Sequence, residues 1–271
     1  SFTSANWNSA QTVTVTGVDD SVVDDNVTYN VVIGSATSND SNYDGVDAED
    51  ISLKSINDDL LIGGSIQGSS LSLSGVVTTF AGTTGLSGST DASGISAKFN
   101  EPRGITTDGT NLYLAEYENH TIRKIEISSG IVTTLAGSAG ITGSSDGTGI
   151  SARFKQPSGI VTDGTNLYVS DTFNHTIRKI EISSGIVTTL AGSAGITGSF
   201  DGTGISARFN TPLGITTDGS SNLYVAEYGN HTVRKIVISS GVVTTLAGSA
   251  GSTGSSDGTG ISAKFNTPMG I

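Results

Sequence analysis

The sequence predicts an all-β fold in which one unit of four short strands is copied in series. The first observation behind this prediction is a repeat: residues 120–154 recur at 175–209 with one change, Ser145 against Phe200. A third copy follows, and a partial copy precedes them at 75–99. The second observation is composition, because 37 of the 271 residues are glycine, and Val, Ile, Ser and Thr are frequent. A repeat of roughly 55 residues with several strand-like runs indicates a copied supersecondary unit.

Each copy carries four strand signals, which the second copy illustrates. A short apolar run precedes an Asp-Gly turn, a second strand, a long alternating strand and a closing strand; these runs span 159–162, 167–170, 175–182 and 186–190. Four antiparallel strands in series are typical of the blade of a β-propeller. A solenoid is the alternative, but meanders of four short strands favour blades.

The blade count predicts an incomplete ring. We expect one lone outer strand at Val76–Phe80, three full blades at about 103–136, 158–191 and 213–247, and the first strand of another at Pro268–Ile271. A propeller typically needs about four to eight blades to close. Residues 75–271 are therefore expected to be a partial propeller within a longer protein.

Residues 1–59 predict part of a second, acidic all-β domain, and the Gly/Ser-rich residues 60–74 predict a linker. Strands are expected at 11–16, 27–33 and 51–56, between Asp-rich turns. Residues 1–60 hold 11 of the 25 acidic residues and a single lysine. Clustered carboxylates suit Ca²⁺, and a solvated acidic face is the alternative.

Three strings carry a family resemblance. Residues 111–125, 166–180 and 222–236 share Asn-Leu-Tyr, an acidic residue, and Asn-His-Thr followed by Arg-Lys-Ile, and Pro-x-Gly-Ile precedes each string. They resemble the NHL repeat over roughly residues 75–271. The resemblance implies a propeller, and a binding role more often than catalysis.

The N-terminal residues resemble the second half of a Calx-beta domain, an immunoglobulin-like sandwich. The resemblance rests on Phe2-Thr with Trp7, on Gln-Thr-Val-Thr-Val from Gln11, and on the closing Ile-Asn-Asp-Asp at 56–59. Members of that family commonly bind Ca²⁺ through acidic residues at one end of the sandwich. The resemblance thus implies calcium as the one cofactor, held by carboxylates among Asp19, Asp20, Asp24, Asp25, Asp58 and Asp59.

Several classes of site are excluded or made improbable by composition. With no cysteine, the chain has no disulfide, thiolate metal site or cysteine nucleophile. The net charge of −12 and the lack of a basic patch argue against nucleic acid as a partner. No apolar run reaches the roughly 18 residues of a transmembrane segment.

Two sets of recurring polar residues are predicted to be structural. The histidines at 120, 175 and 231 begin the third strand of each blade, away from the central axis, so we expect packing or hydrogen bonding between blades in preference to a shared metal. The carboxylates at 116, 171 and 227 precede Arg123, Arg178 and Arg234, and we expect ion pairs that tie strands or blades together.

The binding surface is predicted from strand direction. Because the strands of a blade alternate, the loops after the second and fourth strands emerge on the same face. One loop is short and aromatic, and the other is long and rich in Gly and Ser. Loops on a rigid scaffold carry function, so the predicted partner-binding residues are Tyr117, Phe173, Tyr228 and Phe200.

These observations predict a non-catalytic binding, adhesion or scaffold module of a large secreted or cell-surface bacterial protein. Its partner is expected to be a protein or a glycan, and no catalytic residue is predicted, because near-identical blades offer no unique cluster. One alternative is a propeller enzyme, similar to a lyase or lactonase, with a metal in the central channel. The other is a structural stalk or filament element.

Overall fold

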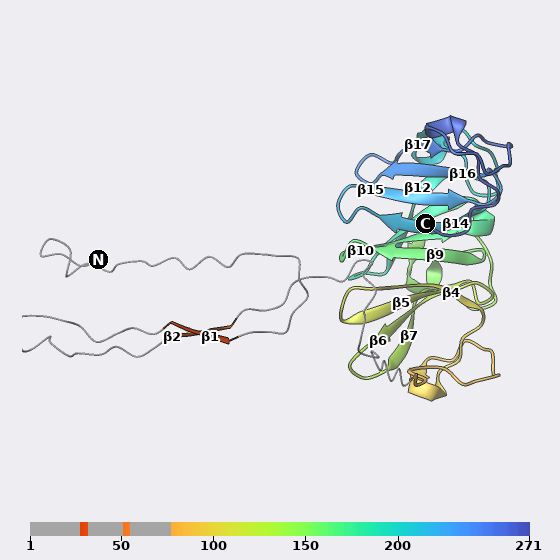
Figure 1. Ribbon diagram of the computed structural model, residues 1–271. Helices are drawn as coiled ribbons and strands as arrows, with labels where there is room; N and C mark the ends of the chain where they lie inside the picture. The colour runs from red at the N-terminus through yellow and green to blue at the C-terminus, as the bar shows by residue number, and fades with distance from the viewer. Residues whose placement is uncertain (1–27, 32–50, 55–76) are drawn as a thin grey trace, which may run out of the picture. The chain divides into compact units, whose positions relative to one another are not determined.

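The computed structural model describes residues 28–31, 51–54 and 77–271 and divides the chain into two units, Ser1–Gly75 and Val76–Ile271 (Figure 1). In the first unit, β1 (Thr28–Val31) and β2 (Ile51–Lys54) pair in antiparallel fashion. They correspond to two of the expected strands. The third expected strand and the linker at 60–74 lie outside the described residues.

The second unit is all-β and contains three antiparallel sheets, which confirms the predicted fold class. The first blade consists of β4 (Pro102–Thr107), β5 (Asn111–Glu116), β6 (Thr121–Glu126) and β7 (Ile131–Gly137). The second consists of β9 (Pro157–Thr162), β10 (Asn166–Asp171), β11 (Thr176–Glu181) and β12 (Ile186–Gly192). The third consists of β14 (Pro212–Thr217), β15 (Asn222–Glu227), β16 (Thr232–Val237) and β17 (Val242–Ala247).

Each sheet gains a fifth strand that sequence analysis did not predict. These two-residue strands are β3 (Ala92–Ser93), β8 (Gly147–Thr148) and β13 (Gly202–Thr203), and they pair with β7, β12 and β17. Each is followed by a single 3-10 turn: η1 (Gly94–Ser96), η2 (Gly149–Ser151) and η4 (Gly204–Ser206), while η5 (Gly260–Ser262) closes the last copy. A further 3-10 turn, η3 (Thr172–Asn174), follows β10.

The long Gly/Ser loop was predicted only as a loop, and the structure shows that part of it forms the fifth strand. That loop leaves β7 at Gly137, runs along the outer strand β12 of the next blade, and reaches the opposite end of that strand. There the N–H of Gly149 donates to the carbonyl of Gly185 over 2.9 Å. An outer strand has unpaired N–H and C=O groups on its free side, and the loop satisfies part of them.

The expected strand at Val76–Phe80 is a second correction, because the described residues 77–80 take no strand pairing. An outer strand forms by hydrogen bonding to the third strand of its own blade. The sequence before Val76 contains no copy of that third strand, whose pattern in the later blades is Thr-Ile/Val-Arg-Lys-Ile.

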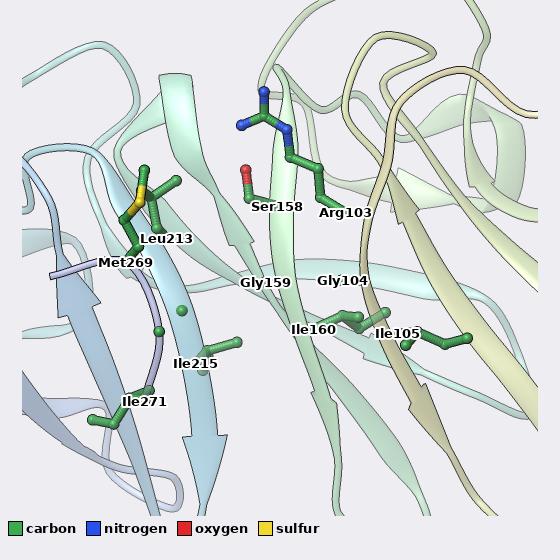
Figure 2. Close-up of a pocket in the computed structure, with 12 residues that line it drawn as sticks. Arg103, Gly104, Ile105, Ser158, Gly159, Ile160, Leu213, Ile215, Met269 and Ile271 are labelled. Atoms are coloured by element: carbon green, nitrogen blue, oxygen red, sulfur yellow. The ribbon is translucent and has the colours of Figure 1, made fainter. Parts of the chain in front are cut away.

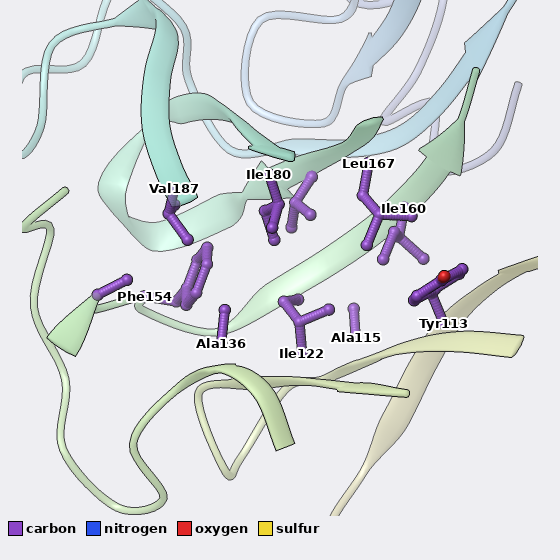
Figure 3. Packing of buried hydrophobic residues seen from close by; sticks show 11 residues of the cluster. Tyr113, Ala115, Ile122, Ala136, Phe154, Ile160, Leu167, Ile180 and Val187 are labelled. Carbon is purple, nitrogen blue, oxygen red and sulfur yellow. The ribbon is translucent and has the colours of Figure 1, made fainter. Parts of the chain in front are cut away.

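The hydrophobic core lies between successive blades (Figure 3). Alternation along each strand decides which side chain faces which neighbour. In β10, Leu167 and Val169 pack toward the first blade, whereas Tyr168 packs toward the third. Ile160 is accordingly only 6% exposed, while the equivalent Ile105, with no preceding blade among the described residues, is 57% exposed.

The Pro-x-Gly-Ile motif sets the spacing of the innermost strands. A Cβ atom on Gly104 or Gly159 would overlap the backbone of the next inner strand, and one on Gly214 would lie 2.7 Å from the carbonyl oxygen of Met269. Residues 269–271 therefore approach β14 as β14 approaches β9. Glycine is needed here for close approach and not for an unusual φ.

Candidate functional site

The loops after the second and fourth strands begin on one face of the blades, as predicted. In the first blade, Glu116 at the end of β5 pairs with Thr121 at the start of β6, and Thr121 pairs with Gly137 at the end of β7. Pro102, at the start of β4, also pairs with Glu116. We call this end of the blades the loop face.

A pocket of about 340 Å³ lies at the loop-face half of the innermost strands (Figure 2). Its wall consists of the last three residues of four successive Pro-x-Gly-Ile motifs, where x is the residue that differs from copy to copy. The four prolines of these motifs are the four prolines of the whole chain. The glycines leave backbone exposed to the pocket, so its chemical character depends on the four x residues.

The x residues are Arg103, Ser158, Leu213 and Met269. Figure 2 shows Arg103 and Ser158 near each other on one side of the pocket and Leu213 and Met269 together on the other. The four isoleucines lie further along the inner strands, away from these side chains. This position was not predicted from the sequence. The signal that could have found it is a variable residue between an invariant proline and an invariant glycine in every copy.

The guanidinium of Arg103 stacks over the ring of Tyr117. Its guanidinium carbon lies 3.2 Å from the ring centroid of Tyr117, a cation–π contact. Tyr117 in turn meets Phe173 of the second blade edge to face, with ring centroids 6.2 Å apart. Within the described residues, the guanidinium of Arg103 has one polar partner, the exposed carboxylate of Glu101, with which it forms a 3.4 Å ion pair. Most of its donors therefore remain available to a ligand.

Ser158 belongs to a group of hydroxyls found in the second blade alone. It is buried, and its Oγ lies 3.0 Å from Oγ1 of Thr172. Thr172 donates to the carbonyl of Pro212 over 2.8 Å. The equivalent positions carry Arg103 with Tyr117 in the first blade and Leu213 with Tyr228 in the third.

The predicted partner-binding residues occupy different places. Tyr117 and Phe173 are in contact, and Phe173 and Tyr228 are 40% and 38% exposed. Phe173 is nevertheless not the equivalent of Tyr117. The N–H of Phe173 donates to the carbonyl of Lys155, and the N–H of Gly229 donates to the carbonyl of Asn210. Phe173 is therefore the equivalent of Gly229 in the third blade.

Phe200 is the outlying member of that set. It is 73% exposed and precedes β13, which is the strand of the third sheet furthest from β14. Four strand spacings of about 4.8 Å separate the two edges, or roughly 19 Å. Phe200 therefore lies at the outer edge, and the other three aromatic residues lie on the short loops of the loop face.

The three histidines form hydrogen bonds between repeats, as predicted. Each Nδ1 accepts a backbone N–H from just before the innermost strand of the next copy: Gln156 to His120 at 3.2 Å, Thr211 to His175 at 3.2 Å, and Thr267 to His231 at 3.0 Å. An Nδ1 that accepts carries no proton. Burial lowers the pKa of His120 and of His175, which keeps both rings neutral.

Acidification should therefore weaken the contact between blades. A depressed histidine pKa contributes stability that is present above about pH 6.5, the unfolded value, and is lost as the pH falls through the folded pKa. A His120→Asn/His175→Asn variant keeps residues that tolerate the positive φ of 60° and 58°. We expect it to be less stable by about 1 kcal/mol per lost bond at pH 8.

The measurement is the melting temperature of both proteins between pH 8 and pH 5. The difference between them should shrink as the pH falls below about 6.5, because the unfolded state of the unsubstituted protein then binds protons on two histidines whose folded pKa is lowered. Asp171 titrates in this window with the opposite sign, since burial raises its pKa to about 6, so the difference and not the absolute stability is the test. A difference that stays constant with pH would contradict the assignment.

The predicted ion pairs are present and fully buried. Arg123, Arg178 and Arg234 bind Glu116, Asp171 and Glu227 at 2.9, 2.9 and 2.8 Å, and all six side chains are inaccessible to solvent. Each guanidinium also lies 5.1–5.2 Å from the centroid of a phenylalanine ring, partly buried in the case of Phe99 and fully buried for Phe154 and Phe209. These side chains hold strands together.

The second acidic partner of each arginine was not predicted from the sequence. The Nη atom of each arginine that does not bind the first carboxylate binds an aspartate: Arg123 binds Asp91 at 2.6 Å, Arg178 binds Asp146 at 2.8 Å, and Arg234 binds Asp201 at 2.8 Å. They come from the long loop that covers the outer strand. The arginine thus joins its own sheet to that loop through the loop aspartate.

No group of three or more His, Asp or Glu side chains that could hold a metal is found within residues 77–271. The predicted calcium residues, Asp19, Asp20, Asp24, Asp25, Asp58 and Asp59, lie outside the described residues. In the part of the chain that the structure describes, no helix is long and apolar enough to cross a membrane.

Comparison with known proteins supports the repeat assignment. No family model matches the chain. NHL repeat-containing protein 2 of Bos taurus is 30% identical over 151 residues, which are 51% of this chain and 21% of that protein. Protein SUPPRESSOR OF QUENCHING 1, chloroplastic, of Arabidopsis thaliana is 30% identical over 183 residues, which are 62% of this chain and 17% of that protein. The chain thus spans about a fifth of the length of these relatives.

Among solved structures, an auxiliary nutrient binding protein from Bacteroides ovatus shows the same fold. It aligns with a TM-score of 0.51 and 21% identity, over 65% of this chain and 43% of that one. With the strand order and the repeat spacing, these similarities show that this chain carries β-propeller blades homologous to NHL repeats.

Proposed function

We propose that this propeller is a non-catalytic binding module that takes a protein or glycan on its loop face, around the central pocket. The observation that carries this proposal is the location of the differences between repeats. Residues 100–154 and 155–209 differ at ten positions, and seven of these fall at 100–103 and 115–118. These are the loop-face ends of β4 and β5 and the adjoining chain.

A scaffold alone gives no reason for differences to gather at this place. The turns at the opposite end of the blades, Asp108-Gly-Thr and Asp163-Gly-Thr, are identical, and there the aspartates accept hydrogen bonds from Tyr113 and Tyr168. Surface loops carried by a rigid framework are where binding residues concentrate. Two of the seven positions, Ala115/Ser170 and Glu116/Asp171, are buried in both blades. The other five are at least partly exposed in one blade, which supports selection for a particular surface chemistry at the loop face.

The composition of the pocket favours binding over metal-assisted catalysis. Its twelve lining residues are Arg, Ser, Leu, Met, Gly and Ile, and none of them has a carboxylate or an imidazole. The propeller enzyme considered above would need such side chains at the innermost strands to hold a metal. The absence of an asymmetric acid–base pair within this lining supports a binding role.

The proposal also covers the larger protein to which this module belongs and its N-terminal residues. We propose that the module belongs to a large secreted or cell-surface bacterial protein and that its acidic N-terminal residues bind Ca²⁺. Calorimetric titration of the chain with Ca²⁺ tests the second point. An Asp19→Asn/Asp20→Asn variant should lose the binding heat, and a titration without heat in the unsubstituted chain would remove the idea.

Binding through the loop face can be tested by screening the chain against a glycan array and a displayed peptide library. A Tyr117→Ser/Phe173→Ser variant removes the aromatic pair beside the pocket, so we expect it to lose at least tenfold in affinity for retained binders. Phe200→Ser is the matched control, since Phe200 is more exposed and lies at the outer edge. We expect that control to bind normally.

The melting temperature should be measured on the same variants. Binders held equally well by the Tyr117→Ser/Phe173→Ser variant and the unsubstituted chain would place recognition elsewhere. Loss of folding in that variant would mean that the pair is core, and Glu118→Lys, which alters the same short loop, would then decide.

A further inference from the structure

The Pro-x-Gly-Ile motif places one freely chosen side chain per blade at the central pocket. Proline and glycine are fixed in all four copies, whereas x is Arg103, Ser158, Leu213 and Met269 in turn. The fixed residues have a structural reason, because the glycines allow neighbouring inner strands to approach. No such reason fixes x, so this position can change the pocket without changing the fold.

The polar side of the pocket suits an anion. Arg103 presents a planar guanidinium that forms one 3.4 Å ion pair with the exposed Glu101 and keeps its other donors free. The cation–π contact with Tyr117 limits its conformations. A carboxylate accepts two parallel hydrogen bonds from such a group. The fixed orientation lowers the entropy lost when a ligand binds.

The opposite side suits an apolar group. Leu213 and Met269 lie together there, and the side chain of Met269 is largely exposed (Figure 2). Methionine adapts its shape to irregular apolar ligands. No charged residue lines this side of the pocket.

We propose that the four x residues form a ligand-selecting ring and that the ring takes a small carboxylate with an apolar body, its anionic end on Arg103 and its apolar end on Leu213 and Met269. This inference rests on the proposed function of the loop face. It goes beyond that function, because it adds a small-molecule ligand to the protein or glycan and names the four residues that select it.

The test is calorimetric or NMR titration of the full chain with octanoate, acetate and octanamide. Acetate lacks the apolar body, and octanamide is a neutral molecule of nearly the same shape. We expect octanoate to bind at least tenfold more tightly than either. Arg103→Gln should lose about tenfold in octanoate affinity and leave octanamide unchanged, whereas Met269→Ser should weaken both.

Arg153→Gln is the matched control, because it removes the same charge from a side chain that binds only neighbouring carbonyls in the loop. Octanoate binding that is undetectable at millimolar concentration, or that survives Arg103→Gln, would overturn the inference. So would equal affinities for octanoate and octanamide. If glycans or peptides are still captured through the aromatic pair, only this inference fails and the proposed function stands.

Discussion

An Arg178→Met variant is expected to lose about 3–5 kcal/mol of unfolding free energy, because it leaves a buried carboxylate without its partner. Arg178 is inaccessible to solvent and binds Asp171 at 2.9 Å and Asp146 at 2.8 Å. Burial raises the pKa of Asp171 to about 6, and the nearby Arg178 is the main influence that opposes this rise. Equilibrium urea denaturation measures the loss.

Two comparisons separate charge from packing. Arg153→Met removes an arginine from the loop surface and should cost less than about 1 kcal/mol. In Arg178→Met the pKa of Asp171 should rise further, so the deficit should be largest at pH 8 and shrink as the pH falls through the new folded pKa. A deficit below about 1 kcal/mol at pH 8 would show that the pair contributes little.

A Gly159→Ala variant is expected to lose about 3 kcal/mol, the upper end of the range for overpacking. The new methyl group would overlap the carbonyl oxygen of Leu213 and crowd Ile215. Both contacts belong to β14 of the next blade, so relief requires a backbone shift between two blades and not a side-chain rotation.

Gly270→Ala is the matched control for this prediction. Gly270 occupies the same place in the motif, but a Cβ atom there would meet nothing within 4 Å. Its φ is not in the positive range, so alanine is tolerated, and we expect a change within about 0.5 kcal/mol. Equal losses in the two variants would contradict the close-approach explanation. Thermal and urea unfolding of both variants provide the measurement.

Parts of the candidate site could be predicted and parts could not. The shared loop face follows from strand alternation alone, and Arg178 with Asp171 follows from a recurring pair of opposite charges. The second partner, Asp146, is 32 residues away in the chain and reaches Arg178 only because the loop folds along β12. A local pattern cannot indicate such a contact.

The sequence by itself determined the repeat, the four strands of each blade and the all-β class, because a period-2 alternation and Asp-Gly turns are local signals. Only the tertiary structure decided that the long loop supplies a fifth strand, and that Arg103, Ser158, Leu213 and Met269 surround one pocket. Successive members of this set are about 55 positions apart in the chain, and they meet because similar blades turn about a common axis. Periodicity thus specifies each blade, whereas the packing of one blade against the next creates the site.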